Sequence, residues 1–186
     1  MRTVSPRLAI LLLAASLPAA AFSGCDGRPD APAAAVAATA ATAGPDHRFV
    51  ITVGDQPVRM RLAVLDHERN RGLMHVPAMP EDEGMLFVFR APQRMSFYMR
   101  NTRIPLDIGY FTADGTLQEV YPMYPYVEDA VLSNTSDMQL ALEMNQGWYA
   151  RHGVKPGARI DLHALEAALR ERGFSREDFP GESSAR

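Results

Sequence analysis

The composition of the chain changes abruptly near residue 46, and this break limits where a packed domain can form. Residues 26–46 are mostly alanine with proline, threonine, glycine and aspartate, and no apolar stripe at helical spacing runs through them. Alanine favours helix, but a segment of this kind cannot bury enough apolar surface to build a core. We therefore predict a flexible tether over residues 25–46 and one packed domain in the remainder of the 186 residues.

After residue 47 the sequence consists of short apolar or alternating segments. Residues 58–64 alternate apolar and basic side chains at period two, which is typical of a half-buried antiparallel strand. Residues 85–89 are a continuous apolar run of strand length, and Asp114-Gly115 is a hairpin turn signal. Many short strands predict a mainly β (α+β) domain over residues 47–162, antiparallel-rich and partly closed like a β-barrel.

Helices are predicted to be few and short. Asp66 can cap a helix that runs through Met74, and a second short helix is expected near Trp148. Beyond the β domain, Asp161 can cap a helix with an apolar face that ends at Gly173. We assign residues 163–186 to this added C-terminal helix and a frayed polar tail.

Four sequence motifs occur in order along the predicted domain: RGLM (71–74), PEDEGMLFVF (80–89), FYMRNTRIPLD (97–107) and LEMNQGW (142–148). Together they resemble an uncharacterised bacterial and archaeal family, domain of unknown function 192, over about residues 48–162. Tyr98 stands where the family commonly has tryptophan, and Arg100 where lysine is common. The resemblance implies a single compact, mainly β domain that is frequently exported, and it brings no established reaction.

The N-terminus has the layout of a signal peptide over residues 1–24. Arg2 and Arg7 precede an apolar stretch that ends near Phe22, shorter than the roughly 20 consecutive apolar residues of a membrane-spanning helix. Residues 22–25, FSGC, resemble a bacterial lipobox, in which the cysteine is acylated. We predict lipid attachment at Cys25, export, and a membrane partner reached through this lipid on the periplasmic side. Cleavage after Ala21 would instead give a soluble periplasmic protein.

Charge and residue usage disfavour several classes of protein. The formal net charge is -3 and no basic cluster occurs, so we expect no nucleic-acid partner. Cys25 is the single cysteine, which excludes an intramolecular disulfide and a cysteine-based metal cage. The five histidines are scattered, and neither a nucleophile elbow nor a phosphate-binding glycine loop is present. The sequence therefore predicts no cofactor, no metal and no catalytic residue.

Four polar residues interrupt apolar or turn-forming motifs and are the candidate ligand-binding residues: Arg71, Asn101, Asp107 and Glu143. In one interpretation they are scaffolding, with Arg71 paired to a carboxylate and Asn101 securing a turn. In the other they line one concave mouth that binds a small polar ligand. Our leading hypothesis is a non-enzymatic envelope module that binds such a ligand or an envelope protein.

Two other functions are compatible with these residues. Asp107 and Glu143 can form an acid–base pair, as in a carbohydrate-active or other hydrolase, if they lie close together. Methionine thioethers suit Cu(I), but methionine is also a common core residue, and packing is the favoured interpretation. The methionines concerned are Met74, Met79, Met85, Met95, Met99, Met123, Met138 and Met144. Residues 121–126, YPMYPY, can form an aromatic surface for sugars or simply cover the domain.

Overall fold

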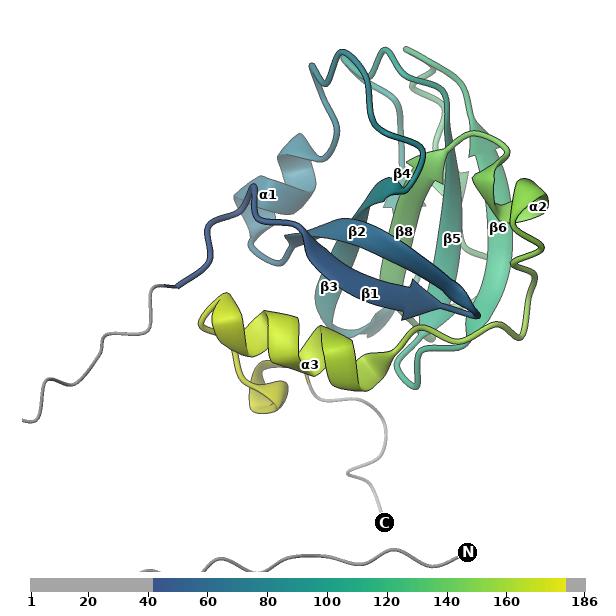
Figure 1. Ribbon diagram of the computed structural model, residues 1–186. Helices are drawn as coiled ribbons and strands as arrows, with labels where there is room; N and C mark the ends of the chain where they lie inside the picture. The colour runs from purple at the N-terminus through teal and green to yellow at the C-terminus, as the bar shows by residue number, and fades with distance from the viewer. Residues whose placement is uncertain (1–41, 180–186) are drawn as a thin grey trace, which may run out of the picture. The chain divides into compact units, whose positions relative to one another are not determined.

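The computed structural model describes residues 42–179 (Figure 1). The predicted signal peptide, Cys25 and most of the predicted tether lie outside these residues, as does the end of the tail. Its strands are β1 (Phe49–Val53), β2 (Gln56–Ala63), β3 (Glu83–Gln93), β4 (Ser96–Phe97), β5 (Leu106–Thr112), β6 (Leu117–Met123), β7 (Val131–Leu132) and β8 (Met138–Asn145). Its helices are α1 (Asp66–Arg71), α2 (Trp148–Arg151), α3 (Leu162–Glu171) and the short 3-10 helix η1 (Arg176–Asp178).

Six strands form one mixed sheet in the order β1-β2-β3-β8-β5-β6, and β4 pairs with β7 in a small second sheet. Every pair in the large sheet is antiparallel except β2 and β3, which are parallel and connected through α1. Parallel strands need such a crossover, because a tight hairpin cannot join them. The prediction of a mainly β domain with few short helices is confirmed.

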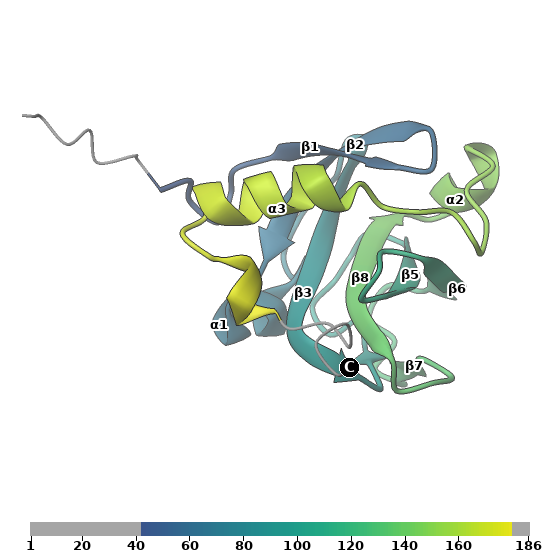
Figure 2. The same ribbon diagram turned by 90° about the horizontal axis from the view of Figure 1, so that it is seen from below.

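The large sheet is open, but one segment approaches both of its edges. β1 and β6 are the edge strands. Val53 of β1 forms an isolated bridge to Ile160, and Thr116, just before β6, forms one to Arg159. Figure 2 shows the strong curvature of the sheet, with α3 running beside β1. The predicted partial closure therefore takes the form of a curved open sheet bridged at one end.

The two faces of this sheet bury different material. Along β8, Leu140, Leu142 and Met144 belong to one core cluster, whereas Ala141 belongs to the other, because successive side chains of a strand point to opposite faces. The first cluster includes Leu165, Ala168 and Leu169 of α3, so we call this side the α3 face. The second includes residues from connecting segments, among them Leu73, Met99 and Ile104, and we call it the loop face.

On the α3 face the packing is close enough to require a glycine. A Cβ atom on Gly109 of β5 would lie 2.4 Å from the hydroxyl of Tyr149. That hydroxyl donates a hydrogen bond to the carbonyl of Leu142, at 2.9 Å, and Tyr149 is 2% exposed. Trp148 packs edge-on against Tyr149 and is also buried. The predicted helix near Trp148 is thus α2, which is fixed onto the sheet by two aromatic side chains.

The helix boundaries partly differ from those predicted. The α3 prediction is correct at its start, because the Asp161 side chain accepts a hydrogen bond from Ala164 N at 3.0 Å. The α1 prediction is wrong at both ends: Leu65 is the N-cap, and the helix ends at Arg71, before Gly72 with its φ of 47°. Asp66 is the first helical residue and gives no cap, because the Glu68 carboxylate accepts from Leu65 N instead, at 3.0 Å.

The end of the predicted tether lies against the folded domain. Ala43 N donates to the carbonyl of Glu171 at the end of α3, at 2.7 Å, and the carboxylate of Asp46 lies 3.8 Å from the guanidinium of Arg61. The packed part therefore begins a few residues earlier than the sequence indicated. Within residues 42–179, no helix has both the length and the hydrophobicity that crossing a membrane requires.

Candidate functional site

A small pocket of about 120 Å³ lies between α1 and the loop face of the sheet. Its polar lining consists of Asp46, Arg61, His67, Glu68 and Arg71, and Met85 contributes apolar surface. Arg61 of β2 is paired with Met85 of β3, so both side chains project from the same face. The pocket therefore combines a sheet residue, a short helix and the chain that enters β1.

Arg61 is the most buried cation in the pocket lining. Its side chain is 14% exposed, and its closest charged partner is the Asp46 carboxylate at 3.8 Å. Within residues 42–179 its guanidinium donates no hydrogen bond. Burial and the nearby Arg48 guanidinium lower the pKa of Arg61, while Asp46 and Glu83 oppose that shift. An anion placed against Arg61 would satisfy donors that the described chain leaves without acceptors.

Arg71 is the second cation of the pocket, and it was one of the four predicted site residues. It is exposed at the end of α1 and forms neither a hydrogen bond nor an ion pair with any residue that the structure describes. Arg69 of the same helix differs completely. Its guanidinium donates to the carbonyls of Val64 and Val88, pairs with Asp66 and lies 4.9 Å from the Phe89 ring centroid.

Most of the acidic side chains around the pocket already have hydrogen-bond or ion-pair partners. One Glu68 oxygen accepts from Val64 N and Leu65 N, and the other is paired with Arg172 in a buried ion pair. Burial opposes ionisation of Glu68, but these three partners outweigh it and lower its pKa. Asp46 is the exception, since its side chain is 87% exposed.

Asp107 is not in the pocket, because it lies on the α3 face. It pairs with Met144 of β8, and its carboxylate accepts from Gly147 N at 2.7 Å. Burial raises the pKa of Asp107, and the Gly147 N–H and the Arg151 charge oppose this shift. Gly147 is the N-cap of α2 with a φ of 82°, so Asp107 fixes the turn that leads into this helix.

Glu143 lies on the loop face in the same cross-strand row as Arg61. In the register it is opposite Met85 on one side and Ile108 on the other. It is 5% exposed and accepts no hydrogen bond from the described chain. Burial raises its pKa to about 8, although the Arg61 charge opposes this. At neutral pH its carboxyl group is therefore mainly protonated.

The register separates the two carboxylates of the hydrolase hypothesis. Adjacent paired residues share a face of a sheet and successive residues alternate. Asp107 pairs with Met144, whereas Glu143 pairs with Ile108, so they project from opposite faces. The acid–base pair between Asp107 and Glu143 does not form, and the predicted pairing of Arg71 with either carboxylate is also not present.

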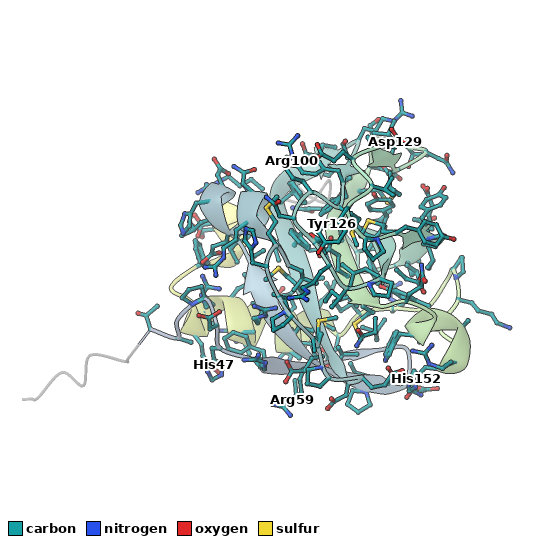
Figure 3. The ribbon with its side chains drawn as sticks, turned by 90° about the horizontal axis from the view of Figure 1, so that it is seen from above. His47, Arg59, Arg100, Tyr126, Asp129 and His152 are labelled. Carbon is teal, nitrogen blue, oxygen red and sulfur yellow. The ribbon has the colours of Figure 1, made fainter. Side chains whose placement is uncertain are left out.

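Asn101 lies at a turn and connects this turn to a neighbouring loop. It is exposed with a φ of 54°, and its carbonyl accepts from His75 N at 2.9 Å. Tyr126 N donates to Thr102 O at 3.1 Å, which ties in a third loop. Figure 3 shows Arg100, which precedes Asn101 in the sequence, and Asp129 at one end of the molecule. It shows His47, which follows Asp46 of the pocket lining, and Arg59 at the other end. The four predicted residues do not share one mouth, and Arg71 alone of them lines the pocket.

Sequence reasoning missed Arg61, which is the central residue of the pocket. In the alternating segment 58–64, Arg59 and Arg61 are equivalent by pattern. Arg59 is half-exposed and pairs with Glu83 at 3.3 Å, whereas Arg61 is covered by α1 and the chain before β1. Only the packing of α1 distinguishes the two arginines, and no local signal encodes it.

The methionines lie largely in the two cores. Met85, Met95, Met99, Met123 and Met138 pack with aromatic and aliphatic side chains on the loop face, and Met144 packs on the α3 face. This agrees with the packing interpretation favoured from the sequence. In the part of the chain that the structure describes, no three histidine, cysteine, aspartate or glutamate side chains converge on a metal position.

Comparisons with known proteins agree with the motif resemblance. A family model, DUF192, described as uncharacterized ACR, matches residues 49–162. The fold is similar to that of a protein of unknown function from Novosphingobium aromaticivorans DSM 12444, with 30% identity, a TM-score of 0.60, and coverage of 66% of this chain and 95% of that chain.

A second similar structure is described as a putative transcription regulator from Sinorhizobium meliloti 1021. It is 31% identical with a TM-score of 0.57, and the match covers 61% of this chain and 91% of that chain. No curated protein matches the chain. Because the family model spans more than half of the 186 residues, this chain belongs to the DUF192 family of uncharacterised proteins.

Proposed function

We propose that this protein is a non-enzymatic binding module of the cell envelope, tethered to a membrane, that takes a small polar ligand in the pocket beside α1. One observation carries this proposal: Arg61 and Arg71 both line the pocket, and neither donates a hydrogen bond to the chain between residues 42 and 179. Arg61 is largely withdrawn from water, which is costly for a cation unless it is well paired, so the pocket favours a bound partner.

The size of the pocket limits the ligand. At about 120 Å³ the pocket is well below the roughly 300–1,000 Å³ of sites that hold drug-sized ligands. A ligand of a few heavy atoms fits, and so does one polar group of a larger molecule whose remainder stays in solvent. Small-molecule sites are usually lined mostly by apolar side chains, with a few polar groups that orient the ligand, so this strongly polar lining favours a polar group.

The location in the envelope rests on the N-terminal sequence. Arg2 and Arg7, the short apolar stretch and the FSGC segment ending at Cys25 favour export and acylation. Each acyl methylene that enters a bilayer contributes about 0.8 kcal/mol, so several chains on one cysteine would anchor the protein stably. The alanine-rich segment that follows suits a spacer between the anchor and the domain.

DNA binding is not part of this proposal, although one similar structure is described as a putative transcription regulator. Affinity for DNA depends on neutralising phosphates with a basic surface. This chain has a net charge of -3, and several of its arginines are paired with carboxylates, including Arg48, Arg59, Arg100 and Arg151.

The pocket is tested by thermal-shift screening of the purified protein against a panel of small polar molecules of positive, negative and zero charge. A ligand that binds the native state must raise the melting temperature. We expect at least one class to stabilise the wild type and the control Arg103→Gln, but not Arg71→Gln. Arg103 is exposed and has no hydrogen bond or ion pair within residues 42–179. A panel without any stabilising compound would contradict the proposal.

The anchor is tested separately by growing cells with labelled palmitate. We expect label on the wild-type protein and none on Cys25→Ala. Equal labelling of the two proteins, or no labelling of the wild type, would refute acylation at Cys25 and leave the soluble periplasmic alternative.

A further inference from the structure

We infer that the ligand of this pocket is a small oxyanion, such as phosphate, sulfate or the carboxylate group of a small organic acid, held between Arg61 and Arg71. The inference rests on the proposed binding function and names its ligand class. It follows from the balance of charge around the pocket, from the hydrogen-bond donors that face it and from the position of Asp46.

The charge around the pocket is not balanced by its own acids. Glu68 is neutralised by Arg172, in an ion pair whose two side chains are 4% and 8% exposed. Glu83, the nearest buried acid of β3, lies 2.6 Å from Arg48 and 3.3 Å from Arg59. These pairs leave Arg61 and Arg71 facing the pocket with a single loosely placed carboxylate, that of Asp46. A net positive pocket selects an anion.

Glu143 does not supply the missing negative charge at neutral pH. It lies two strands from Arg61 on the same face, with Met85 between them in the register. Its burial keeps the carboxyl group mainly protonated up to a pH of about 8. Glu143 is therefore mainly uncharged at neutral pH, and it does not compensate the positive charge of the Arg61 guanidinium.

The arginine N–H donors favour an oxyanion over other kinds of anion. A guanidinium presents its N–H groups in a planar fork that matches two oxygens of a carboxylate, phosphate or sulfate. Arg61 approaches from the sheet and Arg71 from the helix, so one ligand can accept from both. An anion with a single acceptor atom would satisfy fewer of these donors.

The Asp46 carboxylate lies beside Arg61, where an oxyanion ligand would bind, and it therefore competes with the ligand for this position. Its oxygen lies 3.8 Å from Arg61, beyond hydrogen-bonding distance, on a side chain that is 87% exposed. Because the Asp46 carboxylate is exposed and forms no hydrogen bond with Arg61, an external oxyanion can displace it. Removing the Asp46 charge should therefore strengthen binding, whereas removing the Arg71 charge should weaken it.

The experiment is isothermal titration of the purified full-length protein with sodium phosphate, sodium sulfate and sodium succinate. Glycerol and ethanolamine serve as neutral and cationic probes, and the ionic strength is held constant with chloride. We expect saturable binding of at least one oxyanion. Arg71→Gln should weaken it about tenfold or more, because one charge-assisted contact contributes roughly 1.5–3 kcal/mol.

Two further variants test whether the change in oxyanion affinity follows the charge of the pocket. Asp46→Asn should strengthen binding about threefold, because it removes a weak competing carboxylate, and Arg103→Gln should leave it unchanged. All three variants alter exposed side chains, so circular dichroism is expected to show folded protein in each case.

The outcomes separate the two proposals. Binding of glycerol or ethanolamine without binding of any oxyanion would overturn the oxyanion inference and leave the binding function standing. Oxyanion binding that Arg71→Gln and Arg103→Gln weaken equally would show general charge attraction and would also overturn it. A protein that binds none of the five probes, and no other compound of the thermal-shift panel, would contradict the binding function itself.

Discussion

The two faces of the six-stranded sheet differ in how completely their buried polar groups are hydrogen-bonded. On the α3 face, the Asp107 carboxylate accepts from Gly147 N and the Tyr149 hydroxyl donates to Leu142 O. On the loop face, the Tyr110 hydroxyl donates to Val131 O, but Glu143 and Arg61 make no hydrogen bond with the described chain, although both are largely buried. Stable cores normally satisfy their polar groups. In our proposal the α3 face is the scaffold, and the loop face carries the ligand site.

The largest difference in stability should come from the core of the α3 face. Trp148 is 1% exposed, so Trp148→Ala should lower the free energy of unfolding by about 3–5 kcal/mol. Tyr98 on a loop is 42% exposed, and Tyr98→Ala should change it by less than about 0.5 kcal/mol. Urea denaturation measures both. Equal losses would mean that α2 is not fixed to the sheet as described.

A pH-dependent effect should belong to Glu143 on the loop face. Its pKa is about 8 in the folded protein and near the ordinary value of 4.5 when unfolded. Between these values the folded state holds a proton that the unfolded state releases, so stability is fully present below about pH 4.5 and is lost as the pH rises through 8. The total loss is on the order of a few kcal/mol.

Glu143→Gln removes this titration, because glutamine is neutral at every pH. Its stability should fall less than that of the wild type between pH 5 and pH 9, as measured by urea denaturation across that range. Parallel pH profiles for the two proteins would show that Glu143 does not titrate in this window.

On the α3 face, Asp107 should act through its hydrogen bond. Asp107→Ala leaves Gly147 N without its acceptor and should cost about 1–3 kcal/mol. Asp107→Asn keeps an acceptor oxygen and should cost less. Thermal denaturation distinguishes the two, and a larger loss for the asparagine variant would contradict a simple capping role.

The smallest effect should come from Arg71, in contrast to Arg69 of the same helix. Arg69→Ala leaves the carbonyls of Val64 and Val88 without this donor and should cost about 1–3 kcal/mol. Arg71→Ala removes a side chain with no partner in the described chain and should change stability by less than about 0.5 kcal/mol. A destabilised Arg71→Ala protein would indicate a structural role for Arg71.

The fold was largely predictable from local patterns, and the site was not. Period-two alternation, apolar runs and the Asp114-Gly115 turn indicated a mainly β domain, because these signals act within a few residues. The α1 boundaries were wrong because Glu68, rather than Asp66, satisfies the N–H groups at the start of the helix. That choice depends on Arg172, 104 residues away in the sequence, which orients Glu68.

The candidate site depends on strand register and on packing between distant elements. The sequence singled out Asp107 and Glu143 as similar acids, but the register places them on opposite faces. It also singled out Arg71, which lines the pocket, and it did not distinguish Arg61 from Arg59. A shift of one residue in register exchanges the faces of a strand, so no single-sequence pattern determines these positions.

The most direct test of the oxyanion pocket is nuclear magnetic resonance of the arginine side-chain Nε–H groups during titration with sodium phosphate. We expect the Arg61 and Arg71 signals to shift with one common saturation curve, while the Arg103 signal stays constant. Unchanged Arg61 and Arg71 signals at phosphate concentrations that saturate binding elsewhere on the protein would contradict the account.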